Sequence, residues 1–158
     1  MSNYNQLYTE PNGQLNRNIM QAAGAIIPIE ITIPNALAEF RTQNKESLPT
    51  PISGLALIDT GATISAVEKE IIESLGVKSV GTTSTSTANG VANHFLYPAK
   101  FRFPTINDFE FDFNSITGVE FGGYTIDNQK VVTLLGRDVL STAIFIYNGT
   151  LGLYSLSF

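Results

Sequence analysis

The stretch Leu57-Ile58-Asp59-Thr60-Gly61-Ala62 decides the fold prediction for this chain of 158 residues. It ends an apolar run, residues 52–58, that predicts a strand and delivers the Asp59 carboxylate to the end of that strand. Gly61 lets the backbone turn sharply just beyond the carboxylate. Asp and Gly are also common in ordinary turns, so the Asp-Thr-Gly tripeptide alone is equally well explained as a simple turn after a strand.

A second element lies about seventy-five residues further along and shifts this balance towards a functional site. Residues 131–135 form a continuous apolar run, which is typical of a strand buried on both faces. The run ends at Gly136, and Arg137, Asp138, Val139 and Leu140 then predict a short turn of helix.

Together the two elements resemble the single-domain, retroviral-type aspartic proteases, the retropepsin-like family. The similarity rests on Asp-Thr-Gly-Ala at 59–62, on Leu-Leu-Gly-Arg-Asp at 134–138, and on a Thr- and Gly-rich hairpin between them. It covers about residues 26–158. It implies an all-β, homodimeric fold, a retropepsin-like β-barrel or sandwich with one or two short helices, that acts as an aspartic endopeptidase.

The resemblance also implies roles for individual residues. Asp59 would be the catalytic carboxylate, and Thr60 would brace the turn through a hydroxyl bond to the backbone of a second subunit. Leu134 and Leu135 would pack behind the catalytic turn. The positions that support the site would be Thr60, Gly61, Leu134, Leu135, Gly136 and Arg137. The positions that bind substrate would be Gly61, Ala62 and Thr63 in the turn, with Ala88, Asn89, Gly90 and Val91 in a flap.

Thr63 departs from the family pattern. Many viral members carry an acidic residue there, and that residue pairs with the arginine of the Gly-Arg element. Arg137 therefore needs another partner, and Asp138 or a carboxylate across the dimer are the alternatives. The flap segment is also poorer in glycine than viral flaps, which leaves the identity of its tip residue open.

The count of catalytic turns predicts the oligomeric state. Hydrolysis of a peptide by carboxylates alone needs two of them close together, one as general base and one as proton donor. The chain contains a single Asp-(Thr/Ser)-Gly sequence, at Asp59. The second aspartate would then come from a second copy of the chain, facing the first across a twofold axis.

The remaining sequence predicts short strands with few helices. Ile27, Ile29, Ile31 and Ile33 alternate as in a strand with one buried face. Ser65 and Glu68 have the spacing of a capping box that would open a helix over residues 67–75. Hairpins are predicted at 79–93, around 107–108 and across 144–156. Residues 1–24 are rich in Asn and Gln and predict a flexible arm, or a tail ordered only by docking, before a protease domain at 25–158.

Composition excludes several classes of site. A net charge of −5 argues against a broad nucleic-acid-binding face. Without cysteine, and with His94 as the single histidine, thiolate and multi-histidine metal sites are excluded, so we expect no metal and no cofactor. His94 itself is most simply a surface or hydrogen-bonded residue. We expect no membrane partner and a cytoplasmic location, because no long apolar segment or signal sequence is present.

One alternative function remains open at this point. The chain could be a non-catalytic, dimeric peptide-binding or scaffold module that keeps the fold without hydrolysis. The intact Asp-Thr-Gly sequence favours the enzyme, whereas Thr63 and the unusual flap leave the module possible. In either case we expect a homodimer that contacts a peptide or an unfolded protein.

Overall fold

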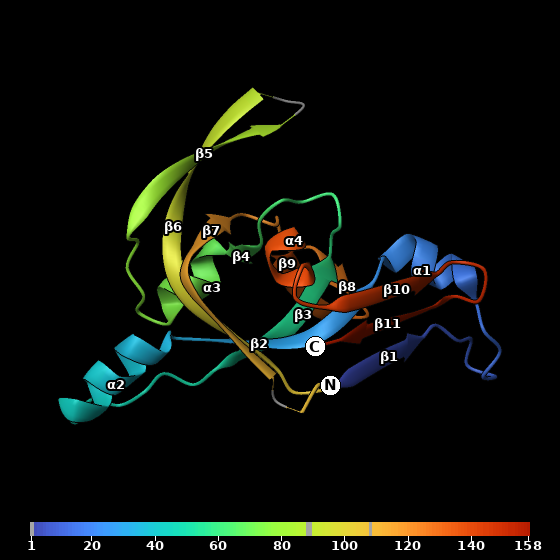
Figure 1. Cartoon of the computed structure of the whole chain (residues 1–158), viewed down its shortest axis with the longest axis horizontal. Coiled ribbons are helices and arrows are strands. Elements are labelled where there is room, and N and C mark those ends of the chain that lie inside the picture. The colour runs from blue at the N-terminus through green and yellow to red at the C-terminus, as the bar shows by residue number, and fades with distance from the viewer. Residues whose placement is uncertain (1, 88–89, 108) are drawn as a thin grey trace.

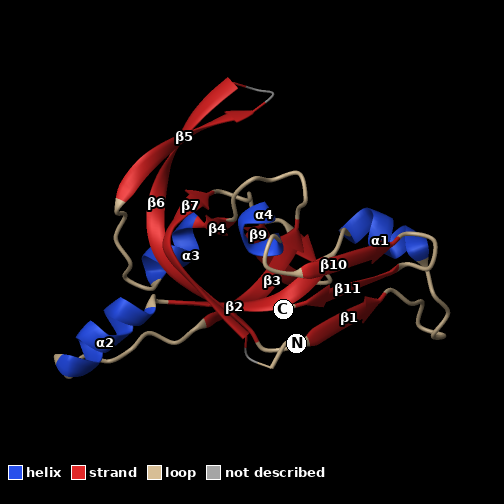
Figure 2. Ribbon diagram, in the orientation of Figure 1, coloured by secondary structure: helices blue, strands red, loops and turns tan. Residues whose placement is uncertain are grey.

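The computed structural model describes residues 2–87, 90–107 and 109–158 (Figures 1 and 2). The strands are β1 (Asn3–Leu7), β2 (Ile26–Thr32), β3 (Ile52–Ile58), β4 (Ala66–Glu68), β5 (Gly81–Thr87), β6 (Gly90–Phe103), β7 (Phe109–Val119), β8 (Thr125–Ile126), β9 (Gln129–Leu135), β10 (Ile144–Asn148) and β11 (Leu153–Ser157). The helices are α1 (Arg17–Ala23), α2 (Asn35–Gln43), α3 (Lys69–Ser74) and α4 (Arg137–Leu140). The all-β prediction is therefore confirmed.

A closed barrel forms the centre of the molecule. Its strands follow the order β2-β3-β9-β4-β7-β6, and β2 pairs again with β6 to close the ring. The alternating isoleucines of β2 explain its place there, because Ile27, Ile29 and Ile31 point into the core and are fully buried. Where the ring closes, Glu30 lies opposite Arg102 and forms an ion pair with it.

The predicted hairpins are present, and one of them projects from the barrel. β5 pairs with the first half of β6, from Gly81 opposite Leu96 to Thr87 opposite Gly90. We call these two strand segments the flap hairpin; Figures 1 and 2 show it rising well above the rest of the molecule. Its predicted turn residues Ala88 and Asn89 lie outside the described residues.

The capping box predicted at Ser65 is wrong. The segment after the Asp59 turn first forms β4, and helix α3 begins only at Lys69, with no side-chain cap at Glu68. Glu68 is instead buried, and its carboxylate accepts a hydrogen bond from the Phe121 backbone N–H at 3.1 Å. Ser65 and Glu68, the two polar side chains that were expected to cap the helix, thus make tertiary contacts instead.

Residues 2–24 are docked on the barrel in this structure and do not extend as a free arm. β1 pairs with β11, and β11 pairs on its other side with β10, giving a separate three-stranded sheet. Tyr8 and Met20 are buried in the same core as the barrel isoleucines. Their apolar burial explains why a segment rich in Asn and Gln is ordered here.

None of the four helices in the described part of the chain is long and apolar enough to cross a membrane.

Candidate active site

Asp59 lies directly after β3, at the point where β3 leaves the barrel. β3 runs parallel to β9, with Ile58 opposite Leu135, and the Asp59 N–H donates to the Leu135 carbonyl at 2.9 Å. The carboxylate then turns back on its own loop, where Oδ1 accepts the Gly61 N–H at 2.8 Å. Asp59 is therefore fixed by two neighbouring strands and by the turn that follows it.

Arg137 holds the turn from the opposite side. One guanidinium nitrogen donates to the carbonyls of Thr60 and Gly61, at 2.8 and 3.1 Å, and the other donates to Thr63 Oγ1 at 2.9 Å. Thr63, the residue that departs from the family pattern, is thus itself a hydrogen-bond partner of Arg137. Asp138, one of the expected partners of Arg137, binds elsewhere.

Ser65 and Asp138 connect the turn to α4 beneath the site. Asp138 accepts from the Ser65 N–H at 2.9 Å and from the Ser65 hydroxyl at 2.7 Å. Ser65 Oγ in turn accepts the Gly136 N–H at 2.9 Å. The sequence prediction missed this network, because the spacing from Ser65 to Glu68 indicated a helix cap instead.

Gly136 is required by close packing against the same turn. A Cβ atom at this position would lie 2.6 Å from the Ile64 carbonyl carbon, a distance that real Cβ contacts do not reach. Because the atoms in the way belong to the backbone of Ile64 and Ser65, they cannot move aside as the end of a flexible side chain could. The predicted supporting role of Gly136 therefore has a steric basis in this structure.

A cleft of about 660 Å³ lies between this turn and the flap hairpin. One wall comes from the turn and the barrel, and the other from the flap hairpin. The lining residues are Gly61, Ala62, Thr63, Ile64, Ala66, Thr117, Val119 and Leu134 on the first wall, and Thr85, Ser86 and His94 on the second. The first wall is mostly apolar, whereas the second is polar.

The predicted site residues take different places relative to this cleft. Asp59 and Thr60 in the turn, and Gly136 and Arg137 against it, are not among the lining residues. Gly61, Ala62, Thr63 and Leu134 line it, and Leu135 is fully buried in the barrel, so that only Leu135 lies behind the turn. Gly90 and Val91 lie at the outer end of the flap hairpin, where Val91 is 73% exposed, and neither is among the lining residues. Ala88 and Asn89 lie outside the described residues.

His94, predicted to be a surface or hydrogen-bonded residue, lines the cleft. Its Nε2 lies 3.0 Å from Thr85 Oγ1, across the flap hairpin. The signal that could have placed it is the strand period: His94 and Ala92 share one face of β6, the face that is less exposed than that of Val91 and Asn93.

The Thr60 side chain is exposed, and within the described part of the chain its hydroxyl has no hydrogen-bond partner. Among the same residues, no group of three or more His, Cys, Asp or Glu side chains is placed to hold a metal ion.

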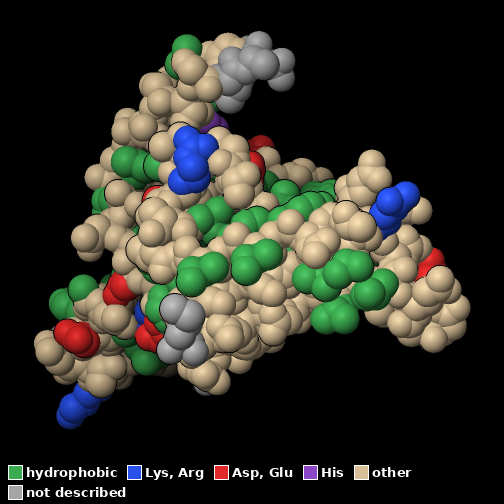
Figure 3. Space-filling view, turned by 45° about the vertical axis from the view of Figure 1, so that its right-hand side comes forward, with side chains coloured by type: hydrophobic (Ala, Val, Ile, Leu, Met, Phe, Trp, Pro, Cys, Tyr) green, Lys and Arg blue, Asp and Glu red, His purple; other side chains and the backbone are tan. Residues whose placement is uncertain are grey.

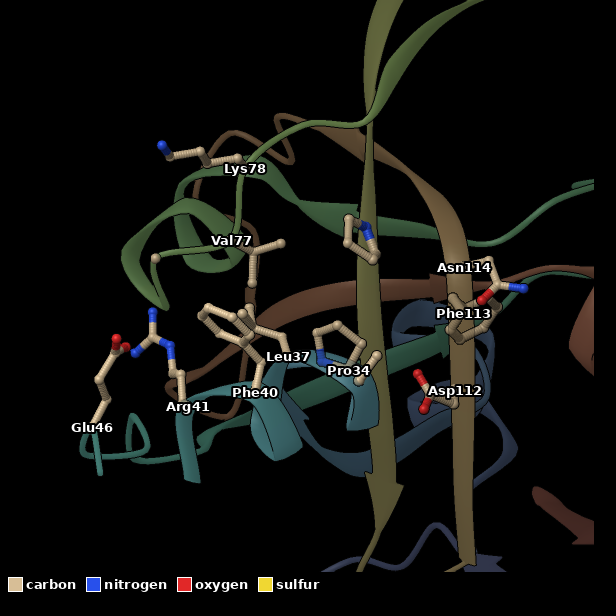
Figure 4. Close-up of a pocket in the computed structure, with 13 residues that line it drawn as sticks. Pro34, Leu37, Phe40, Arg41, Glu46, Val77, Lys78, Asp112, Phe113 and Asn114 are labelled. Atoms are coloured by element: carbon tan, nitrogen blue, oxygen red, sulfur yellow. The ribbon is translucent and has the colours of Figure 1, made fainter. Parts of the chain in front are cut away.

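A second cavity of about 660 Å³ lies beside α2 (Figure 4). Leu37, Phe40 and Val77 give it an apolar floor, and Arg41 and Lys78 lie at its rim. None of the described residues lines both cavities. This cavity is therefore separate from the Asp59 site.

Comparison with known proteins identifies the family. No curated protein matches the chain. The solved structures that are similar to it include the protease of simian foamy virus (mac), with 16% identity over 72% of this chain and 91% of that one and a TM-score of 0.41. They also include a retropepsin-like aspartic protease from Rickettsia conorii, with 15% identity over 99% of this chain and 92% of that one and a TM-score of 0.48. A family model described as aspartyl protease matches residues 51–142, more than half of the chain. The family-model match therefore shows that the chain belongs to the aspartyl protease family.

Proposed function

We propose that this protein is an aspartic endopeptidase that works as a homodimer, with one Asp59 from each subunit. The observation that carries the proposal is the placement of Asp59: it follows β3, its N–H is bound by β9, and the turn that it begins is held by Arg137 and lines an open cleft beneath the flap hairpin from Gly61 onward. Family membership supports a protease, and the single Asp-Thr-Gly turn supports a shared site.

The two carboxylates would divide the chemistry between them. The ionised Asp59 takes a proton from a water molecule as that water attacks the peptide carbonyl carbon. The protonated Asp59 of the second subunit donates its proton to the carbonyl oxygen, which gives a tetrahedral intermediate. Collapse of the intermediate breaks the C–N bond: the first Asp59, now protonated, gives its proton to the leaving nitrogen, and the second Asp59, now ionised, takes a hydroxyl proton from the intermediate as the carbonyl re-forms. Like charges so close together cannot both ionise, so one proton stays on the pair.

The cleft supports binding of an extended peptide. The main chain of the substrate would lie along Gly61, Ala62 and Thr63, with the flap hairpin above it. The Thr60 hydroxyl, which is exposed and has no hydrogen-bond partner within the described chain, would brace the second subunit's turn, as the family resemblance implies.

The test is cleavage of an unfolded protein by wild type and by Asp59→Asn. The amide keeps the shape of the carboxylate but cannot accept the proton, so kcat should fall at least about a hundredfold. Asp127→Asn is the matched control, because Asp127 is exposed at the β8–β9 turn with φ 48°, a conformation that Asn tolerates. Circular dichroism and thermal unfolding should be unchanged in both variants.

Two outcomes would contradict the proposal. Equal cleavage by wild type and Asp59→Asn would remove Asp59 from the mechanism. Binding of extended peptides by wild type without any cleavage would favour the alternative, a dimeric peptide-binding module.

A further inference from the structure

The cleft beneath the flap hairpin changes from apolar to polar across its first wall. One row of paired residues crosses this wall: Leu134 on β9 pairs with Ala66 on β4, and Ala66 pairs with Thr117 on β7. All three residues line the cleft. The row is therefore apolar at β9 and β4 and becomes polar at β7, the strand that lies next to β6 of the flap hairpin.

The Thr117 hydroxyl is buried without a partner. Thr117 is only 3% exposed, and its Oγ1 has no hydrogen-bond partner within the described residues. Such a hydroxyl costs free energy, because it has given up its hydrogen bonds to water and gained none in return. A side chain of the substrate that fills the cleft over Thr117 can supply the missing hydrogen bond, as donor or as acceptor.

His94 lies close to Thr117 on the same face of the sheet. It stands two residues before Leu96, which lies directly opposite Thr117, and residues two apart on a strand share a face. Diagonal neighbours of this kind on an antiparallel pair are about 7–8 Å apart. One polar side chain of a bound peptide can therefore contact both residues. In Figure 3 the single histidine, in purple, is seen beneath the outer end of the flap hairpin.

Thr85 orients the His94 ring and leaves one ring nitrogen for a ligand. His94 Nε2 lies 3.0 Å from Thr85 Oγ1, whereas Nδ1 has no hydrogen-bond partner among the described residues. Nδ1 donates or accepts according to the tautomer of the ring. Thr85 and Ser86 complete the polar second wall.

The charge of the walls narrows the kind of side chain that fits. Among the described residues that line the cleft there is no Asp, Glu, Lys or Arg. A buried charge without a partner costs more free energy than an uncharged polar group that is hydrogen-bonded. The walls therefore favour an uncharged polar side chain at this place.

We propose that Thr117 and His94 are specificity-determining residues, which together bind an amide side chain of the substrate, Asn or Gln, near the cleaved bond. An amide carries both a donor and an acceptor, so it can bond the Thr117 hydroxyl and the His94 ring at once. The inference rests on the proposed function and names the class of sequence that the endopeptidase cleaves.

The first test compares two threonine-to-valine variants. Thr117→Val and Thr133→Val each remove one buried hydroxyl that has no partner among the described residues, and each keeps nearly the same shape. Thr133 is fully buried in the barrel and does not line the cleft, so it is the matched control. Cleavage sites in an unfolded protein, mapped by mass spectrometry, should show Asn and Gln enriched at one position for wild type and for Thr133→Val. Thr117→Val should lose that enrichment.

Paired peptides then measure the preference. Each pair is built on a wild-type cleavage site and carries Asn, or Leu of nearly the same size, at the enriched position. Wild type should give a kcat/KM at least about tenfold higher for the Asn peptide, because polar groups left unpaired in a site reject the apolar analogue. Thr117→Val and His94→Phe should bring this ratio close to one. His94→Gln keeps a hydrogen-bonding group and should retain part of the preference.

Binding provides a measurement that does not need hydrolysis. A random peptide library captured on Asp59→Asn protein should be enriched in Asn and Gln at one position. Adding Thr117→Val to that protein should remove the enrichment, and adding Thr133→Val should not.

The outcomes separate this inference from the proposed function. Cleavage without an amide preference, an equal effect of the two threonine variants, or a preference for Asp or Glu over their amides overturns the role of Thr117 and His94 and leaves the endopeptidase in place. Amide-selective binding that Thr117→Val removes, by a wild type that cleaves nothing, supports the inference and contradicts the proposed function.

Discussion

The position of the Asp59 carboxylate depends on single residues that are distant in sequence. Leu135, Arg137 and Gly136 each contact the turn that contains Asp59, through a backbone bond, a guanidinium fork and a close backbone approach. Ser65 joins them by bonding both Asp138 and the Gly136 N–H. Two predictions at the scale of the residue follow from these contacts.

Ser65→Ala should lower the free energy of unfolding by about 1–3 kcal/mol, because Ser65 is 1% exposed and the change leaves the Gly136 N–H without its acceptor. Urea unfolding measures the loss. Ser141→Ala is the control: its hydroxyl bonds the Asp138 carbonyl at 3.2 Å, but it is exposed, so the change should stay within about 0.5 kcal/mol. Equal losses in the two variants would argue against a buried network at Ser65.

Arg137→Lys should reduce kcat about tenfold or more while KM and stability change little. An ammonium group cannot reproduce the planar fork to Thr60, Gly61 and Thr63, so the turn loses its orientation. Arg137 is exposed, which limits its contribution to folding. Steady-state kinetics checks this, with Arg17→Lys on α1 as the matched control. A rise in KM with unchanged kcat would instead give Arg137 a role in ground-state binding.

At the scale of the element, the flap hairpin differs from every barrel strand. β5 pairs only with β6 among the described strands, and its residues are Gly, Thr and Ser. Little apolar burial holds it, so its backbone amides should exchange with solvent faster than those of β9. Binding of a non-hydrolysable peptide in the cleft should slow that exchange.

Gly90→Val should raise KM. Gly90 has φ +117°, which a β-branched residue adopts only with strain, although a Cβ there would meet no atom within 4 Å. The effect would therefore come from the backbone of the flap hairpin and not from a clash. Ala92→Val, on the same strand without a positive φ, is the control. Kinetics of Gly90→Val that match wild type would place the moving tip elsewhere in the hairpin.

The elements that the sequence predicted well are those with a strong local period. The isoleucines of β2 and the apolar run of β9 both indicated strands, and the structure has them. The Asp59 and Gly136 motifs likewise indicated the two halves of the site. Partners set by tertiary contacts were not predictable, because Thr63 and Ser65 carry no local signal for Arg137 or Asp138.

Strand β11 is a second case in which the sequence did not reveal a tertiary partner. Residues 144–156 were predicted to form a hairpin, and β10 and β11 do so, but the sequence did not indicate that another strand pairs with the second edge of β11. β1 occupies that edge, from Asn3 opposite Ser157 to Leu7 opposite Leu153. A polar segment such as β1 can be recognised as a strand only when its partner strand is known.

At the scale of the whole molecule, tyrosine hydroxyls join the terminal segments to the barrel. Tyr8 donates to the Gly24 carbonyl at 2.7 Å, and Tyr154 donates to the Ile26 carbonyl at the start of β2. Burial raises the pKa of Tyr8 to about 12, and it raises the pKa of Tyr154 well above the usual 10.0. Both hydroxyls therefore stay protonated in the folded chain at pH values where they ionise in the unfolded chain.

Stability should consequently fall in alkali. The folded pKa values are raised, so the contribution is complete below about pH 10 and is lost as the pH rises towards about 12, with a slope of up to about 1.4 kcal/mol per pH unit for each tyrosine. Urea unfolding between pH 8 and 12 measures this decline, and Tyr8→Phe should make it shallower. A free energy of unfolding that stays constant to pH 12 would mean that these hydroxyls do not ionise on unfolding.

The bond from the Asp59 N–H to the Leu135 carbonyl has a consequence for the order in which the chain can fold. A ribosome makes Asp59 well before Leu135 and Arg137, so neither residue yet exists to hold the turn. Contacts between residues so far apart require closure of a long loop, which makes them late events in folding. The nascent chain therefore carries the aspartate without a formed site until Leu135 and Arg137 have been made, and the hydrolysis proposed above could begin only after that point.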